Sequence, residues 1–346
     1  MLKIVASRNP NKNTDYLYSK IKENIEEGKE SYLVVPEQFT LGSELDLFNK
    51  LPYEGFSLVS VKSFRSLVAD ILQTRGGLEK NFISEPAQNI LMKMVLDDIK
   101  SDLDLYGRNI KDRGFIDLLI QLIKEFKNEN IHPLDLVNLM ESPSMSREMK
   151  RKPKDINKIY SSDERTLADS LFDGEDRFVL ALEKVDQMED YKDIVFFFDQ
   201  FHNMSLLEIK LIDSLVDMGA QVYLTSTIDK RLVDSPYQVG EMLVKDAEVF
   251  EISKRFLNHL DKYLDLSYIF LEDESFDNPS LNYLLSSIFS YEKPQAQALE
   301  NIHVKRYNNS LEEVENLVIN IRKDLMEKNY RYKDIAVIVT SPEEYY

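Results

Sequence analysis

The residues that open the chain have the order of a phosphate-binding loop. A short apolar strand, residues 2–6, leads through a polar turn into a sequence with helical spacing. The loop pattern is G-x-x-x-x-G-K-[ST], in which backbone N–H groups hold the phosphates and the lysine reaches them. When Lys12 is set on the motif lysine, Ala6 and Asn11 fall on the two glycines and Asn13 falls on the Ser/Thr. These residues are the first candidates for binding a nucleotide.

The same residues depart from the loop chemistry at several positions. Glycine gives the backbone the positive φ angles that the loop needs, and of the two replacements Asn11 tolerates such angles better. Pro10 removes one N–H donor, Asn13 is a poor ligand for Mg²⁺, and Thr14 stands one position late for that role. Two interpretations follow: an ATP site that uses Lys12, Asn13 and Thr14, or a loop that keeps only the shape of one. The departures favour the second.

A further candidate lies in the segment FFFDQFH, residues 196–202. Asp199 follows the most apolar strand expected in the chain, where an Asp of a phosphoryl-transfer enzyme holds Mg²⁺. The next residue, Gln200, cannot position water as a base, because an amide is not a base. The alternative role of Asp199 is to cap a neighbouring helix. Two incomplete motifs in the correct order suggest a helicase-like core that has lost its motor, so we expect no catalytic residue here.

The elements that would position these residues alternate along the chain. Apolar strands are expected at residues 31–35, 57–62, 193–199 and 220–227, with amphipathic helices between them. Such alternation is typical of a parallel sheet with helices on both faces. The expected fold class is therefore α/β, a P-loop NTPase or RecA-like parallel sheet.

A long helical segment interrupts this pattern. Residues 84–185 have helical spacing and no convincing strand, so we interpret them as a helical insertion. The core would then consist of residues 1–83 and 186–297, of which residues 229 onward look mostly helical. Inside the insertion, residues 141–158 are polar and basic and contain two prolines. They are expected to form a surface loop or, alternatively, a nucleic-acid contact through the cations Arg147, Lys150, Arg151, Lys152 and Lys154.

The last part of the chain has the pattern of a second unit. Residues 298–346 are expected to contain a helix from Ser310 and a strand at residues 334–340. A unit that stops one strand after its first helix cannot bury both faces of a sheet. We therefore expect the chain to be a truncated piece of a longer protein.

Charge and composition exclude several classes of function. The formal net charge of −18 argues against a protein that simply coats nucleic acid, although it permits a local basic groove. The chain has no cysteine and therefore no disulfide, thiolate zinc site or Fe–S ligand, and its four histidines lack metal-ligand spacing. No apolar run approaches the roughly 20 residues of a membrane span, and no signal peptide is visible. A cytoplasmic protein without a metal or a membrane partner is expected.

Four segments resemble one family in that family's order. VVPEQFTLGSELDLF and VSVKSFRSLVADILQ are similar to segments of the B subunit of bacterial AddAB helicase–nucleases, called RexB in a related branch. FFFDQFHNMSLLEIKLI resembles its D-G-F-x-x-[FM]-[ST]-x-x-E segment, and the sequence from Asn301 resembles the opening of its second helicase-like domain. Together the segments span the whole chain.

The resemblance implies a superfamily 1 helicase-like fold, with residues 298–346 as the truncated start of a second helicase-like domain. In this family the A subunit unwinds DNA with ATP, whereas the helicase half of the B subunit drives no translocation. It scans the exiting single strand for a short sequence called Chi. The nuclease domain with its Fe–S cluster lies further along, which agrees with a chain that lacks cysteine.

The resemblance also implies which residues contact DNA. They are Gln38, Thr40, Phe64, Arg65, Ser66 and Phe201. Ser66 stands where the family has an arginine, although Arg65 is adjacent, and Ala69 replaces a tryptophan. Loss of a base-reading arginine and a stacking tryptophan weakens the expectation that Chi is recognised.

The expected function follows from the motifs and the resemblance together. The chain would be the non-motor, N-terminal part of a subunit of an ATP-dependent exonuclease that repairs DNA double-strand breaks. It would bind single-stranded and double-stranded DNA, form a heterodimer with the helicase A subunit, and need no cofactor of its own. The alternatives are an ATPase that uses Lys12 and Asp199, and a scaffold that only docks the A subunit.

Overall fold

The structure is a computed structural model. It describes residues 1–51, 53–77, 82–108, 112–142, 145–167, 172–234, 250–271, 278–287, 300, 302–341 and 345. The chain forms two compact units, Met1–Phe276 and Asp277–Tyr346, which are described separately.

The first unit is built on a six-stranded sheet in which all strands are parallel. The strand order is β3-β2-β4-β5-β1-β6. The strands are β1 (Leu2–Ser7), β2 (Ser31–Val34), β3 (Val59–Lys62), β4 (Val195–Phe198), β5 (Gln221–Thr227) and β6 (Leu266–Phe270). The predicted parallel α/β sheet is confirmed, and its form is consistent with a RecA-like fold.

Strand β4 shows why the sheet has two covered faces. Its four residues are all buried and alternate between the faces. Phe196 and Phe198 belong to the core beneath one layer of helices, whereas Val195 and Phe197 belong to the core beneath the other. A strand buried on both faces is continuously apolar, which is the pattern that the sequence carries here.

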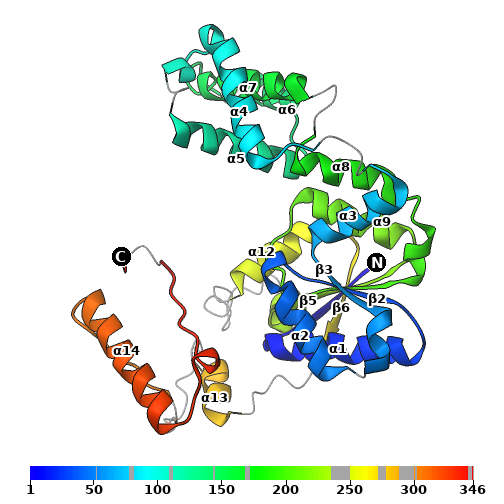
Figure 1. Cartoon of the computed structure of the whole chain (residues 1–346), viewed down its shortest axis with the longest axis vertical. Coiled ribbons are helices and arrows are strands. Elements are labelled where there is room, and N and C mark those ends of the chain that lie inside the picture. The colour runs from blue at the N-terminus through cyan, green and yellow to red at the C-terminus, as the bar shows by residue number, and fades with distance from the viewer. Residues whose placement is uncertain are drawn as a thin grey trace. The chain divides into compact units, whose positions relative to one another are not determined.

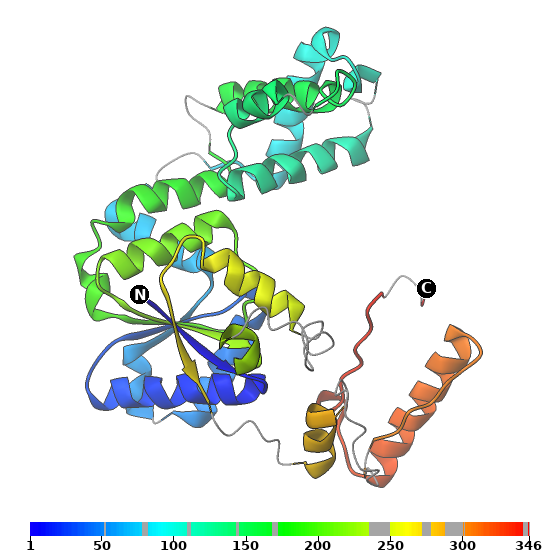
Figure 2. The ribbon, with the colours of Figure 1, turned by 180° about the vertical axis from the view of Figure 1, so that it is seen from behind.

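Two layers of helices cover these faces (Figures 1 and 2). The helices α1 (Pro10–Glu26) and α2 (Thr40–Lys50) pack on one face. The other face is covered by α3 (Phe64–Arg75), α9 (Leu206–Asp217) and α12 (Glu251–Leu260). The short helix α10 (Lys230–Asp234) follows β5.

The strand register brings the carboxyl ends of five strands to one edge. Val34 of β2 lies opposite both Lys62 of β3 and Phe198 of β4. Phe198 is paired with Leu224 of β5, and β1 and β5 run side by side to their last residues. In open α/β sheets ligands bind outside this edge, which makes it the place to look for a site.

The insertion is helical in all of its described residues apart from short turns and an isolated bridge between Phe82 and Phe172. Its helices are α4 (Glu85–Ile99), α5 (Arg113–Asn128), α6 (Pro133–Glu141) and α7 (Arg151–Leu167), which share a small core of their own. Helix α8 (Gly174–Val185) then packs against α3 and α9 and joins the insertion to the sheet layer.

Three expectations about secondary structure are wrong or incomplete. Helix α7 begins at Arg151, inside the segment that was expected to be a surface loop. Pro153 is compatible with this helix because it lies in the first turn, where a residue without an N–H group costs no helical hydrogen bond. Strand β6 lies within the stretch expected to be mostly helical. Its five residues pair with β1, and this tertiary pairing gives no local signal beyond a short apolar run.

The third of these expectations concerns the second unit, which contains α13 (Pro279–Ser287) and α14 (Ser310–Glu327). The segment expected to be a strand, residues 334–340, carries no strand in the structure. Ile338 in that segment is 92% exposed. An apolar sequence alone does not form a strand, because a strand needs a neighbouring strand for its hydrogen bonds.

Candidate nucleic-acid interface

A cavity of about 520 Å³ lies where a RecA-like fold would hold a nucleotide. It opens at the carboxyl ends of β1, β4 and β5, between the start of α1 and Asp199. Its charged lining residues are three carboxylates, Asp15, Asp46 and Asp199, and one cation, Lys50. An excess of carboxylates repels a triphosphate, so the charge of this cavity does not suit ATP.

The turn between β1 and α1 is closed to phosphate. It consists of Arg8 and Asn9 alone, and Arg8 lies 3.6 Å from Asp229. The side chain of Asn9 accepts a hydrogen bond from the N–H of Asn11 at 3.1 Å, and its carbonyl accepts from the N–H of Lys12 at 3.1 Å. Because Pro10 has no N–H, the first turn of α1 has already used the donors that a phosphate would need.

Of the other predicted nucleotide residues, Asn13 has a structural role and Lys12 lies outside the cavity lining. Asn13 is buried; it accepts a hydrogen bond from Ser7 at 2.7 Å and donates one to the carbonyl of Ser226 at 3.0 Å. Lys12 is not among the residues that line the cavity. Lys50 lines it instead, but its ammonium group lies 2.9 Å from Asp15.

Asp199 is 2% exposed and fully engaged in hydrogen bonds. Its carboxylate accepts from the hydroxyl of Thr225 at 2.6 Å, from the hydroxyl of Thr14 at 2.8 Å and from the N–H of Gln200 at 3.0 Å. Burial raises the pKa of Asp199 above its ordinary value, and these hydrogen bonds oppose that shift. Thr14, one position late for the sequence motif, is therefore the residue that meets Asp199.

Two of the predicted DNA-binding residues lie near the start of α2: Gln38 precedes the helix and Thr40 is its first residue. Gln38 is exposed, and Thr40 donates a hydrogen bond to the carbonyl of Glu37 at 3.0 Å. Arg65, at the start of α3, has a side chain that is 78% exposed, and the nearest oxygen of its ion partner Glu37 is 3.5 Å away. An ion pair that is long and exposed to solvent is weak, so the guanidinium of Arg65 can bind another anion.

The predicted aromatic and serine positions are placed differently. Phe64 and Phe201 are only 4% and 8% exposed, and their ring centroids lie 5.2 Å apart. Both rings also contact Phe198. Ser66 forms a reciprocal capping box with Ser63 at the start of α3, with the N–H of Ser63 donating to the Ser66 hydroxyl at 2.7 Å. In this conformation these three side chains support the edge of the sheet.

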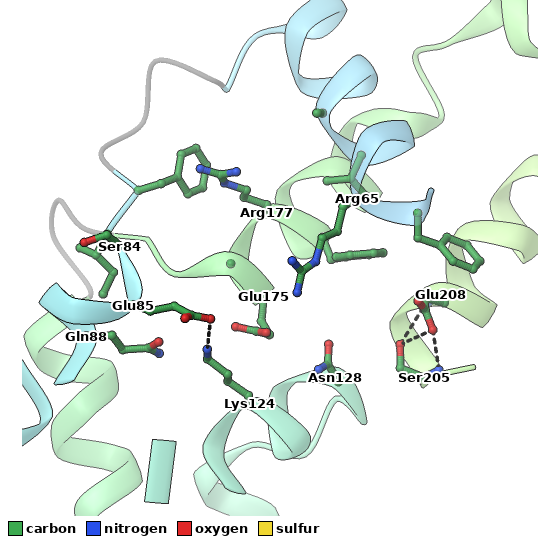
Figure 3. A pocket seen from close by; sticks show the side chains of 17 residues that line it. Arg65, Ser84, Glu85, Gln88, Lys124, Asn128, Glu175, Arg177, Ser205 and Glu208 are labelled. Atoms are coloured by element: carbon green, nitrogen blue, oxygen red, sulfur yellow. Dashed lines mark hydrogen bonds and ion pairs between the residues drawn. The ribbon is translucent and has the colours of Figure 1, made fainter. Parts of the chain in front are cut away.

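A second cavity, of about 490 Å³, lies beside Arg65, between the sheet layer and the insertion (Figure 3). Arg65 enters it from α3, Arg177 from α8 and Lys124 from α5. The guanidinium of Arg177 stands 4.0 Å from the centroid of the Phe82 ring. Lys124 lies 3.8 Å from Glu85. The cavity therefore combines cations with an aromatic wall.

Its amide lining is also available for hydrogen bonds. Gln88 is 6% exposed, lines the cavity and has no side-chain partner among the described residues. Asn128 faces the cavity near Arg65 (Figure 3). One oxygen of Glu175 is buried without a hydrogen-bond partner, and burial raises the pKa of that carboxyl. A ligand that forms hydrogen bonds with these groups, such as a nucleobase, would satisfy buried polar atoms that otherwise cost free energy.

The sequence did not point to Arg177, Lys124 or Gln88. They lie in the insertion, outside the motifs at the strand ends. Only the packing of α8 on α3 and α9 brings them to the carboxyl edge of the sheet. No local pattern encodes that packing.

Comparison with known proteins agrees with this architecture. A family described as "ADDB, N-terminal" matches residues 4–284. The chain belongs to the AddB N-terminal family. The match covers the insertion and all of the sheet except the first two residues of β1.

Curated AddB relatives extend the comparison. The chain is 28% identical over 327 residues to proteins of Bacillus thuringiensis subsp. konkukian, Bacillus cereus strain AH187 and Bacillus anthracis. Each of these is named as the B subunit of an ATP-dependent helicase/deoxyribonuclease. The similarity covers 92% of this chain, and the chain spans only 28% of the length of these relatives.

Sites of two other kinds are absent from the described residues. No helix among them has the length and apolar character to cross a membrane. No cluster of three or more histidine, aspartate or glutamate side chains within the described ranges is arranged to hold a metal ion.

Proposed function

We propose that this chain is the non-motor, strand-binding part of a DNA-repair helicase–nuclease subunit. Membership of the AddB N-terminal family supports the subunit role. The cavity of Figure 3, at the carboxyl edge of the sheet, supports the binding of a single strand. The unwinding and nuclease activities named for the relatives would then depend on the rest of such a protein and on its partner, the A subunit.

The observation that carries the proposal is the convergence of Arg65, Lys124 and Arg177 from three helices around one cavity. Single strands bind where cations follow the phosphates and where flat groups stack on the bases. The pair of Arg177 and Phe82 supplies a flat, charged group of this kind. Each base stacked in such a site contributes roughly 1–3 kcal/mol.

Of the three carboxylates that line this cavity, Glu85 pairs with Lys124, and the other two are Glu175 and Glu208. Glu208 uses its oxygens to cap α9, accepting from the N–H of Ser205 at 2.8 Å. Burial raises the pKa of both Glu208 and Glu175, which favours their neutral forms. Arg65 and Arg177 are thus the groups most available to phosphate, in a chain whose net charge of −18 repels DNA elsewhere.

ATP has no part in this proposal. The helix start that would hold its phosphates is capped by Asn9, and the aspartate that would hold Mg²⁺ is bonded to Thr14 and Thr225. Chi recognition stays a prediction: Ser66, at the arginine position, serves as a helix cap, so Arg65 is the base-reading candidate that remains.

The test is a titration of a labelled single-stranded oligonucleotide with the chain and two variants. Arg65→Ala and Arg177→Ala should each weaken binding about three- to tenfold and lower the salt dependence by about one unit per lost phosphate contact. Arg255→Ala is the matched control, because its side chain is 77% exposed and also pairs with one glutamate, Glu251. Equal affinities for all three variants would overturn the proposed cavity.

A further inference from the structure

The turn before α7 and the first turns of this helix carry an unusual concentration of positive charge. Between residues 147 and 158 the chain has six cationic side chains and two anionic ones, in a protein with a net charge of −18. One of the two anions, Asp155, is fully buried and accepts hydrogen bonds from the N–H groups of Asp104, Leu105 and Tyr106. The carboxylate of Asp155 therefore lies inside the protein, and the surface of residues 147–158 is basic.

The helical path places most of these cations on one side. The N–H of Lys150 bonds to the carbonyl of Ser146 and that of Lys154 bonds to Lys150, so the turn at 147–150 continues into α7. We call one set the basic stripe: Arg147, Lys150, Arg151, Lys154 and Lys158. Spacings of three, four, seven and eleven residues bring its members within a narrow arc of the helix, over roughly 16 Å.

Most of the stripe is free to meet a partner. Arg147, Lys150 and Lys154 have no ion pair among the described residues. Arg151 is held by Asp104 through two hydrogen bonds, at 2.9 and 3.2 Å, and Lys158 donates to the carbonyl of Asp102, so these two cations already have partners. The helix behind the stripe is fixed by the buried side chains of α7, which pack against α4 and α6.

We propose that the basic stripe binds the phosphate backbone of double-stranded DNA. No aromatic side chain belongs to the stripe, whereas sites for single strands combine cations with stacking groups, as the cavity beside Arg65 does. A straight row of cations on a rigid helix suits the outer surface of a duplex, where phosphates are the accessible groups. The inference rests on the proposed function only in taking DNA as the nucleic acid.

The experiment compares a labelled blunt duplex with a labelled single-stranded oligonucleotide, each titrated with the chain at several salt concentrations. The triple variant Arg147→Gln, Lys150→Gln, Lys154→Gln should bind the duplex at least about tenfold more weakly at low salt, with a salt slope reduced by about three. Its affinity for the single strand should not change. An unchanged helical circular dichroism signal would show that the variant is folded.

The matched control removes three positive charges elsewhere, as Lys22→Gln, Lys192→Gln, Lys262→Gln, all at exposed lysines. It should leave duplex binding unchanged. Equal duplex binding by both triple variants would overturn the proposal. Equal losses of affinity for the duplex and for the single strand would overturn the assignment of the stripe to a duplex. If the single strand binds neither the parent chain nor any variant, that result would count against the proposed function instead.

Discussion

The hydroxyl of Thr14 donates a hydrogen bond to the carboxylate of Asp199 at 2.8 Å, across the gap between α1 and the end of β4. Asp199 is the candidate that the sequence offers for holding Mg²⁺, and Thr14 stands one position beyond the Ser/Thr of the phosphate-binding loop pattern. In this chain they bond directly to one another, and Thr225 takes the other oxygen at 2.6 Å. These hydrogen bonds join the start of α1 and the end of β5 to the residue that follows β4.

Removal of a hydroxyl at this position should therefore cost stability. Thr225→Val leaves an oxygen of buried Asp199 without its shortest hydrogen bond, so we expect the free energy of unfolding to fall by about 1–3 kcal/mol. Urea denaturation followed by circular dichroism measures the change. Thr74→Val, at an exposed position of α3, is the control and should change stability by less than about 0.5 kcal/mol. An equal effect of the two substitutions would contradict the structural role of Asp199.

Phe64→Ala should act on folding before it acts on binding. The Phe64 ring is buried against Phe198 and Phe201, and removal of a buried phenyl ring costs about 3–5 kcal/mol. Phe64→Leu fills most of the same space and should cost less than about 1.5 kcal/mol while keeping single-strand binding. Loss of binding by a well-folded Phe64→Leu variant would show instead that the ring itself stacks on a base.

We expect the ion pairs of Lys127 to stabilise the packing of α5 of the insertion against the start of α8. Its ammonium group lies 2.6 Å from Asp173 and 3.1 Å from Asp176, and both it and Asp173 are buried. Lys127→Met leaves these carboxylates without their cation, with an expected loss of about 3–5 kcal/mol. The double variant Lys127→Met, Asp173→Asn should recover part of that loss. Equal stability of the parent and the single variant, by urea denaturation, would refute this role.

Asp163 should make stability depend on pH. Burial raises its pKa to about 6 from an ordinary value of 3.8, and one of its oxygens has no hydrogen-bond partner. Between these values the folded chain holds a proton that the unfolded chain has released. The contribution of Asp163 to stability is therefore complete below pH 3.8 and is lost as the pH rises through about 6.

Asp163→Asn removes this titration. The variant should be more stable than the parent at pH 7.5, by about 1–2 kcal/mol, and the difference should disappear near pH 4. Urea denaturation at the two pH values measures it. A difference of the same size at both would mean that the carboxyl of Asp163 does not titrate in this range.

The sequence predicted the sheet well, because β4 and the other internal strands are continuously apolar and their helices have clear spacing. It also predicted that Asp199 ends β4. It missed β6, whose only signal is five residues, and it could not foresee that Phe64 and Phe201 turn into the core. The cavity beside Arg65 was beyond prediction, because Lys124 and Arg177 reach it only through the packing of the insertion.

The most direct measurement is the affinity for a labelled single-stranded oligonucleotide at low and moderate salt, with and without ATP and Mg²⁺. The chain should bind the strand, and the affinity should fall with salt and be unaffected by ATP. Binding that requires ATP would contradict the closed site at Thr14 and Asp199 and support the rival ATPase. Failure to bind at low salt would contradict the strand-binding role and favour a scaffold that only docks a partner subunit.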